Sequence, residues 1–249
     1  MQRYFVPVDQ IQERTIMVIG EDAKHIARVM RMREGDEVIC CDGQGRSWLV
    51  RLVELETDRV VGTILRELDE NVEPTVKLTL AQSLPKGDKM DLIVQKGTEV
   101  GITVFQPLET ARTIVEYDAK KQAKRRERWQ RIAKEAAEQA HRTFIPEIRT
   151  SQSLGFWLSS IQEYDLVLMP YEGEEQRGIR EVLTRFPQVT TIAIVIGPEG
   201  GFDKEEVERA KAAGVQTVSL GPRILRTETA GLVTASAILY HYGELGGGK

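Results

Sequence analysis

The chain has 249 residues, of which 41% are hydrophobic and 29% are charged. This composition is typical of one or two soluble globular domains and excludes a predominantly disordered chain. The formal net charge is −4, so only local basic patches could contact nucleic acid. Cys40 and Cys41 are adjacent and the three histidines lie far apart, so we expect neither a disulfide framework nor a metal site. No apolar signal core or membrane-spanning run is visible, and a cytoplasmic location is expected.

Residues 1–70 predict short strands interrupted by one helix. The stretches rich in β-branched residues are 3–7, 15–19, 37–41, 48–55 and 59–68. The Asp-Gly-Gln-Gly sequence at 42–45 predicts a hairpin turn between two of these strands. Ile26, Val29 and Met30 follow helical spacing, and Gly35 then ends the helix. This part of the chain is therefore expected to form a small β-barrel that carries a helix.

Residues 69–74 have few apolar anchors and one proline, and we expect a linker there. Strands and helices alternate after it. The predicted strands are 76–80, 102–108, 166–169, 191–196 and 215–220, and the predicted helices include 88–101, 120–141, 178–185 and 227–242. Asp203, with Glu206 three residues later, predicts a capping box at the start of one more helix. The alternation predicts an α/β domain with a mostly parallel sheet over 75–243, followed by a flexible glycine-rich tail at 244–249.

The most informative segment is the sequence Ile-Gly-Pro-Glu-Gly-Gly-Phe at 196–202, between an apolar strand and a capped helix. Ligands of α/β sheets bind at the carboxyl ends of strands, and glycines there allow a backbone to approach a ligand closely. A tight strand-to-helix turn that needs glycine for its geometry alone is the alternative explanation.

A second segment, Leu-Gly-Pro-Arg-Ile-Leu-Arg-Thr-Glu-Thr-Ala at 220–230, again leads from a strand end into a helix. Its two arginines and the helix start suit a carboxylate, a phosphate or a deprotonated base. In the alternative, Arg226 and Glu228 simply flank a helix start. Neither segment has the spacing of a dinucleotide fingerprint or a P-loop, so a nicotinamide-dependent oxidoreductase is disfavoured.

These two segments resemble the C-terminal motif pair of the SPOUT-class RNA methyltransferases. Further matching stretches occur in the right order at 25–31, 86–91, 96–101 and 135–142. More narrowly, the chain resembles the ribosomal RNA small subunit methyltransferase E family, which makes 3-methyluridine in 16S rRNA. The sequence Lys96-Gly97 departs from the more alanine-like helix that we expect at that position.

The resemblance implies a PUA-like RNA-binding barrel joined to a methyltransferase domain with a C-terminal trefoil knot. It also implies a homodimer that binds S-adenosylmethionine within the knotted loops. Carried over by position, the cofactor-binding residues would be Leu168, Met169, Pro170, Ile196, Gly197, Pro198, Glu199, Gly200, Gly201, Leu220, Gly221, Ile224, Leu225, Arg226, Thr229 and Ala230. The activity implied is methylation of N3 of a specific uridine within the small ribosomal subunit. The rival hypotheses are ribose 2′-O-methylation or another RNA target, and a non-catalytic RNA-binding assembly factor.

Methylation of uracil N3 requires that the nitrogen lose a proton, and three side chains are candidates for this step. A cation near the ring carbonyls would favour the uracil anion, and Arg226 is the first candidate. Glu199 could accept the proton or could merely fix a loop. Glu228 competes with it, although glutamates at helix starts are often only partners of the helix dipole. The sequence also allows that neither carboxylate is the base.

Two basic segments are candidates for RNA contact. The segment 120–131 holds seven basic residues and one acid, and its apolar stripe predicts that the basic residues face outward. A solvated helix face is the alternative, and Trp129 lies on the apolar stripe as a core residue. The second patch belongs to the small domain. The candidate RNA-binding residues are Lys24, His25, Arg28, Arg31, Arg33, Lys124, Arg125 and Arg128.

Overall fold

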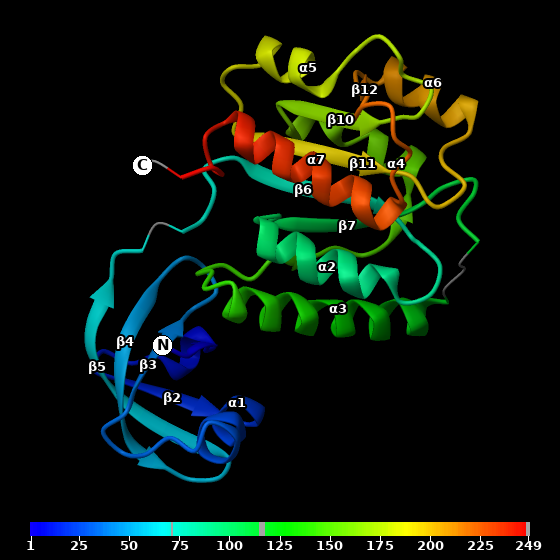
Figure 1. The fold of residues 1–249 in the computed structure, drawn as a ribbon. Helices are drawn as coiled ribbons and strands as arrows, with labels where there is room; N and C mark the ends of the chain where they lie inside the picture. Colours follow the sequence, from blue (N-terminus) through cyan, green and yellow to red (C-terminus); the bar gives the residue numbers. More distant parts are fainter. Residues whose placement is uncertain (71, 115–117, 248–249) are drawn as a thin grey trace. The chain divides into compact units, whose positions relative to one another are not determined.

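The computed structural model describes residues 1–70, 72–114 and 118–247. By their internal contacts these residues form two compact units (Figure 1). The first unit consists of 1–73 together with 137–145, and the second consists of 74–136 and 146–249. Within the part of the chain that is described, no helix is both long and apolar enough to cross a membrane.

The first unit is a five-stranded sheet that carries a short helix, as the sequence predicts. Its strands are β1 (Arg3–Phe5), β2 (Thr15–Ile19), β3 (Glu37–Cys41), β4 (Ser47–Leu55) and β5 (Arg59–Leu68), in the order β1-β3-β4-β5-β2. The predicted hairpin turn joins β3 and β4, and the Asp42 carboxylate accepts the backbone N–H groups of Gln44 and Arg46. Both cysteines are buried and free.

The helix of this unit differs from its predicted pattern. The helix α1 (Glu21–Lys24) continues as a π-helical turn over His25–Val29. Ile26 is fully buried in the hydrophobic core of the first unit, whereas Val29 is 66% and Met30 is 45% exposed. The wide turn therefore directs only the first of the three helically spaced apolar residues into the core.

The expected linker at 69–74 is anchored within the first unit by its acidic residues. Glu70 forms an ion pair at 2.9 Å with Arg3, whose side chain is almost fully buried. Glu73 accepts a 2.6 Å hydrogen bond from Arg142 and further bonds from the backbone N–H groups of Thr143 and Phe144. These contacts explain why 137–145 belongs to the first unit, a feature with no local sequence signal.

The second unit is an α/β domain in which every pairing of the described strands is parallel. The sheet order is β12-β10-β11-β6-β7-β8, and β9 pairs with β7. The strands are β6 (Lys77–Ser83), β7 (Val104–Glu109), β8 (Glu147–Ile148), β9 (Gln152–Ser153), β10 (Leu166–Pro170), β11 (Thr191–Ile196) and β12 (Gln216–Val218). The helices are α2 (Lys89–Val100), α3 (Ala119–Gln139), α4 (Leu154–Leu158), α5 (Ile179–Arg185), α6 (Lys204–Ala212) and α7 (Thr227–His241). A short 3-10 turn at 161–163 also belongs to this unit, and another 3-10 turn lies at 8–10 in the first unit.

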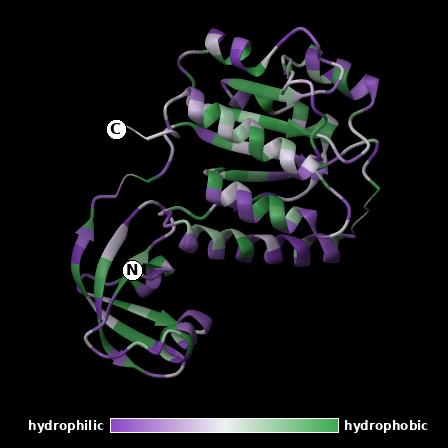
Figure 2. Cartoon of the chain, in the orientation of Figure 1, coloured by the Kyte–Doolittle hydropathy of each residue, from purple (hydrophilic) through white to green (hydrophobic). Residues whose placement is uncertain are grey.

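Helices cover both faces of this sheet, as a parallel sheet requires. Alternate residues of β11 divide between the two faces, with Ile192, Ile194 and Ile196 in one core cluster and Ala193 and Val195 in the other. The first cluster also contains residues of α2, α3, α5 and α7, and the second contains residues of α4 and α6. Figure 2 shows these central strands as predominantly hydrophobic.

Most predicted elements of the second unit are confirmed, and the differences are local. The capping box of α6 is present, with Asp203 accepting the N–H of Glu206 at 2.7 Å and donating its own N–H to the Glu206 carboxylate. The strands β8 and β9 and the helix α4 carried no periodic signal because each has five residues or fewer. The predicted flexible tail is held at its first residue, since Glu244 donates its N–H to the carbonyl of Leu239.

Gly97 departs from the expected alanine-like helix because β7 leaves no room for a side chain. A Cβ atom at this position would lie 2.7 Å from the ring of Phe105 and 2.9 Å from Ile102. We expect Gly97→Ala to lower the free energy of unfolding by about 1–2 kcal/mol, because the overpacking outweighs the gain in helix propensity. Urea denaturation measures the change, and Gln95→Ala at an exposed position of α2 is the control. An unchanged or raised stability of the Gly97 variant would contradict this packing.

Candidate functional site

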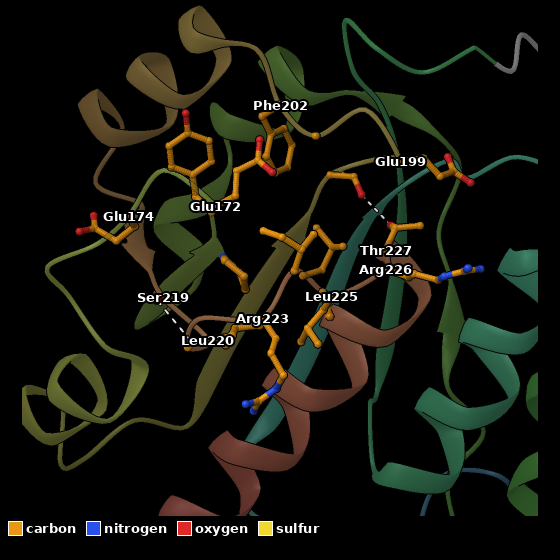
Figure 3. A pocket seen from close by; sticks show the side chains of 18 of the residues that line it. Glu172, Glu174, Glu199, Phe202, Ser219, Leu220, Arg223, Leu225, Arg226 and Thr227 are labelled. Atoms are coloured by element: carbon orange, nitrogen blue, oxygen red, sulfur yellow. Dashed lines mark hydrogen bonds between the residues drawn. The ribbon is translucent and has the colours of Figure 1, made fainter.

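Three loops meet at the carboxyl edge of the parallel sheet and surround a cavity of about 790 Å³ (Figure 3). They follow β10, β11 and β12, which are neighbours in the sheet, and they comprise 171–178, 197–203 and 219–226. Because the strands are parallel, their carboxyl ends lie together, which is the usual location of a ligand site in an open α/β sheet. The structure thus brings the two glycine-containing segments of the sequence to one place.

The hydroxyl group of Thr227 connects two of these loops. Its Oγ1 donates a 2.6 Å hydrogen bond to the carbonyl of Gly197 and accepts a 2.9 Å bond from the amide nitrogen of Gln82 on β6. The predicted start of α7 at Thr227 is correct. The N-cap residue is Arg226, however, and no side chain caps the helix, because a guanidinium group has no hydrogen-bond acceptor.

Most of the predicted cofactor-binding residues line the cavity. They are Pro170, Ile196, Gly197, Pro198, Glu199, Gly201, Leu220, Gly221, Ile224, Leu225, Arg226 and Ala230. Four predicted residues lie outside the lining. Leu168 and Met169 are fully buried within β10, and Thr229 is exposed on α7. Gly200 faces away, because its carbonyl accepts a 2.5 Å hydrogen bond from Arg112 and a Cβ atom there would contact the same side chain.

The list of predicted cofactor-binding residues omitted several residues that complete the cavity, although Phe202, Pro222, Arg223 and Thr227 lie within the two motif segments. The additional lining residues are Lys89, Tyr171, Glu172, Glu174, Glu175, Phe202, Ser219, Pro222, Arg223 and Thr227. Figure 3 shows Glu172 and Glu174 on one side of the cavity, with Glu199 and Arg226 on the opposite side. Glu174 organises its own loop, since it accepts bonds from the Thr217 hydroxyl at 2.6 Å and from Arg177.

Lys89, at the first turn of α2, bridges the two carboxylates that compete for the role of base. Its Nζ lies 2.7 Å from Oε1 of Glu199 and 3.3 Å from Oε2 of Glu228. The other oxygen of Glu228 lies 3.9 Å from Nη1 of Arg226. The Arg226 side chain remains 82% exposed, whereas the Glu228 side chain is only 15% exposed. In the sequence, the only indication that Lys89 belongs to the site was its place in the stretch 86–91, which resembles the methyltransferase family.

The bridge affects the ionisation of Glu199 and Lys89. Partial burial opposes the charge of Glu199, but hydrogen bonds from Lys89 and from the backbone N–H of Lys86 outweigh it and lower the pKa of this carboxyl. The same hydrogen bond to Glu199 raises the pKa of Lys89. At neutral pH the site therefore contains an ionised carboxylate held by an ammonium group, beside an exposed guanidinium.

The basic helix α3 is only partly available for RNA. Arg128 forms an ion pair with Asp91, and Arg125 lies 3.4 Å from Asp88. Trp129 is buried, as predicted, and donates its indole N–H to Asp91 at 3.0 Å. Lys124 is exposed. The charge run thus serves in part to attach α3 to α2.

The second basic patch divides into engaged and unengaged side chains. Lys24 pairs with Glu21 at 2.7 Å, and Nδ1 of His25 lies 3.0 Å from the hydroxyl of Tyr4. Arg28, Arg31 and Arg33 are exposed, and none of them forms an ion pair with a carboxylate within the described residues.

Comparisons with known proteins identify relatives for both units. The family model described as an RNA methyltransferase domain matches residues 72–239, and the one described as an RNA methyltransferase PUA domain matches residues 18–65. The ribosomal RNA small subunit methyltransferase E of Bacillus subtilis is 42% identical, over 96% of each chain.

Two solved structures share the fold along nearly the whole chain. A ribosomal RNA small subunit methyltransferase E from Neisseria gonorrhoeae, bound to S-adenosyl methionine, superposes with a TM-score of 0.87 at 33% identity and covers 96% of this chain and 97% of its own. A putative methyltransferase from Legionella pneumophila, in complex with the bound cofactor SAM, gives a TM-score of 0.87 at 30% identity with the same coverage. With its PUA domain, its parallel sheet and its paired glycine-containing loops, the chain belongs to the ribosomal RNA small subunit methyltransferase E family.

Proposed function

We propose that the protein methylates N3 of a specific uridine in 16S rRNA of the small ribosomal subunit, with S-adenosylmethionine as the methyl donor. The observation that carries this proposal is the cavity at the sheet edge, where an ionised Glu199 and an exposed Arg226 lie on one side. Membership of the family supports the RNA substrate, and the two related structures with bound S-adenosylmethionine support the cofactor.

The residues around the cavity fit S-adenosylmethionine. A volume of about 790 Å³ lies within the ordinary range of cofactor sites. The apolar Ile196, Ile224 and Leu225 would cover the adenine, and the loop glycines allow close backbone approach. The carboxylate of Glu172 would suit ribose hydroxyl groups. The bound cofactor would supply an electrophilic methyl group, and the protein's own side chains would orient the base and remove its proton.

We assign the proton transfer to Glu199 and the stabilisation of the uracil anion to Arg226. Glu199 lines the cavity and is ionised, whereas the more buried Glu228 does not line it and instead lies beside Arg226. A carboxylate of lowered pKa is a weak base, so it accepts the N3 proton only where the resulting anion is stabilised. The exposed guanidinium of Arg226 meets this requirement.

The proposal includes a homodimer in the cytoplasm. On α7, Val233 is 41% and Tyr240 is 68% exposed, and a spacing of seven residues places them on one face of the helix. We assign this apolar face to the contact with a second copy. The trefoil knot that the family resemblance implies stays a prediction.

Calorimetric titration with S-adenosylmethionine, followed by methylation of small ribosomal subunits that lack the modification, tests the proposed function. Binding together with new 3-methyluridine in nucleoside mass spectrometry is the expected result. A different methylated nucleoside would exclude the N3 assignment, and a 2′-O-methylated one would favour the ribose alternative. An absence of binding would favour a non-catalytic RNA-binding assembly factor.

Gly197 and Gly200, in the same loop, provide a matched test of the cofactor site. A Cβ atom at Gly197 would lie 3.2 Å from the ring of Phe202, which also lines the cavity, whereas one at Gly200 would contact only Arg112. We expect Gly197→Val to weaken S-adenosylmethionine binding by about tenfold or more, since the loss of one well-placed contact costs about 1–2 kcal/mol. Gly200→Val should retain affinity within about twofold. Equal loss in both variants would contradict the assigned lining.

Substitution of the two competing carboxylates distinguishes their roles. If Glu199 accepts the N3 proton, Glu199→Gln should lower the single-turnover rate by about 100-fold or more with little change in cofactor affinity. Glu228→Gln should have a smaller effect on the rate, because it leaves the proton acceptor in place. A larger loss in the Glu228 variant would reverse the assignment.

The bridge from Lys89 adds a pH dependence to the same test. The active form of Glu199 is ionised, so the rate should be constant above its pKa and fall below it. Lys89→Met removes the hydrogen bond that lowers this pKa, so the pH of half-maximal rate should rise. Carbon-13 NMR titration of the Glu199 carboxyl should show the same direction. Lys96→Met, which removes only the pair with Glu99 on α2, is the control and should leave both curves unchanged.

A further inference from the structure

The first unit displays two large apolar side chains between unpaired arginines. Val29 is 66% and Met30 is 45% exposed, and both are adjacent in the chain to exposed arginines, Arg28 and Arg31. A third exposed arginine, Arg33, follows two residues later. Adjacent exposed apolar residues are costly in water, and such patches on soluble proteins frequently mark an interaction surface. We call the segment 28–33 the arginine knuckle.

The backbone holds the arginine knuckle in a defined conformation. The π turn closes with a 2.9 Å hydrogen bond from the N–H of Met30 to the carbonyl of His25, and the N–H of Met32 bonds the carbonyl of Ile26 at 3.1 Å. Between them Arg31 adopts φ +52, a left-handed conformation that is unfavourable for a residue with a side chain. Ile26 and Met32 pack on the barrel core, so Val29 and Met30 are held outward from both sides.

Charge indicates the kind of partner that this surface accepts. Several other arginines of the first unit are neutralised, as in the pairs Arg46–Glu67, Arg51–Glu37 and Arg59–Glu54, whereas Arg14 and Arg66 are single exposed arginines without an ion pair within the described residues. The arginine knuckle gathers three such unpaired arginines in one short segment. Asp36 accepts the backbone N–H of Arg33 at 2.7 Å, so it stabilises the turn and not the guanidinium groups. A second copy of the chain would bring these like charges together, whereas RNA phosphates would neutralise them.

We propose that the arginine knuckle binds RNA at unpaired nucleotides, with its arginines on the phosphates and with Val29 and Met30 in contact with unstacked bases. Regular RNA helices shield their base faces, so apolar side chains gain contact area only where bases have left the stack. Apolar side chains that contact exposed base faces are a known means of binding distorted nucleic acid. This inference deepens the proposed function by adding base contact to an RNA-binding surface, and it rests on that function for the RNA substrate.

The test measures the affinity of the full chain for two RNA probes of equal length, a hairpin with an unpaired loop and a blunt duplex. Val29→Ser/Met30→Ser removes the apolar pair and keeps the charges. The triple variant Arg28→Gln/Arg31→Gln/Arg33→Gln removes the charges and keeps the apolar pair. The matched control is Val53→Ser/Leu65→Ser, two exposed apolar residues on the strands of the same unit. All the substituted side chains are exposed, and thermal unfolding verifies that each variant folds.

We expect the apolar variant to bind the hairpin about tenfold more weakly and the duplex within about twofold of the parent, since base contacts are made only by the loop. The arginine variant should lose affinity for both probes. The slope of its log affinity against log salt concentration should become shallower by the amount that corresponds to the loss of about two to three phosphate contacts. The strand variant should bind as the parent does. Unchanged hairpin binding by the apolar variant, or an equal loss on both probes, would overturn the proposal. A change from dimer to monomer in sedimentation would also overturn it, because a second copy would then occupy the surface.

The two proposals fail in distinguishable ways. Binding of S-adenosylmethionine and the identity of the methylated nucleoside test the chemistry without reference to Val29 and Met30. Probe affinity in the absence of the cofactor tests the arginine knuckle without reference to catalysis. A protein that binds the hairpin through the knuckle but forms no 3-methyluridine would retain this inference and lose the N3 assignment.

Discussion

The hydroxyl group of Thr227 is the link on which the geometry of the cavity depends. Its bonds to the Gly197 carbonyl and to Gln82 join the start of α7, the loop after β11 and the end of β6. These segments are far apart in sequence and meet only because the sheet is parallel. The link thus fixes the loop that carries Glu199 relative to the helix start that carries Arg226. A small hydroxyl suits the task because it donates and accepts within one tight space.

The second constraint is electrostatic and acts on the same two segments. Glu199 and Glu228 are like charges that would repel each other, and Lys89 offsets that repulsion from a third element, α2. Lys89 lies closer to both carboxylates than Arg226 lies to Glu228, and Arg226, at 3.9 Å from that carboxylate, stays exposed. A guanidinium fully engaged by a carboxylate would be a poor partner for a uracil anion. Lys89 thus makes the close contacts with the carboxylates, and the guanidinium group of Arg226 stays available.

The sequence predicted the regular elements well because periodicity and caps are local properties. The capping box at Asp203 and the hairpin at 42–45 needed no knowledge of the fold. Lys89 and the loop acids Glu172 and Glu174 were missed because their role arises from contacts between distant segments. Gly200 was predicted to line the cavity because it lies between Glu199 and Gly201, which do line it. Only the direction of its backbone, toward Arg112, distinguishes it from Gly197. The membership of 137–145 in the first unit depends on Glu73 and Arg142, which no spacing rule connects.

Basic runs in this chain do not all have the same meaning, and the difference lies in their partners. The run on α3 is the longer one, yet its Arg125 and Arg128 lie against the acids of α2 and help to fix a helix. The arginines of the shorter knuckle form no ion pair within the described residues, and its conformation exposes apolar side chains at the cost of a left-handed residue. In a protein with a net charge of −4, affinity for a polyanion depends on cations that the protein itself leaves unpaired. The segment 120–131 therefore holds more basic residues, but its charges are divided between ion pairs and solvent, whereas none of the three arginines of the knuckle forms an ion pair within the described residues.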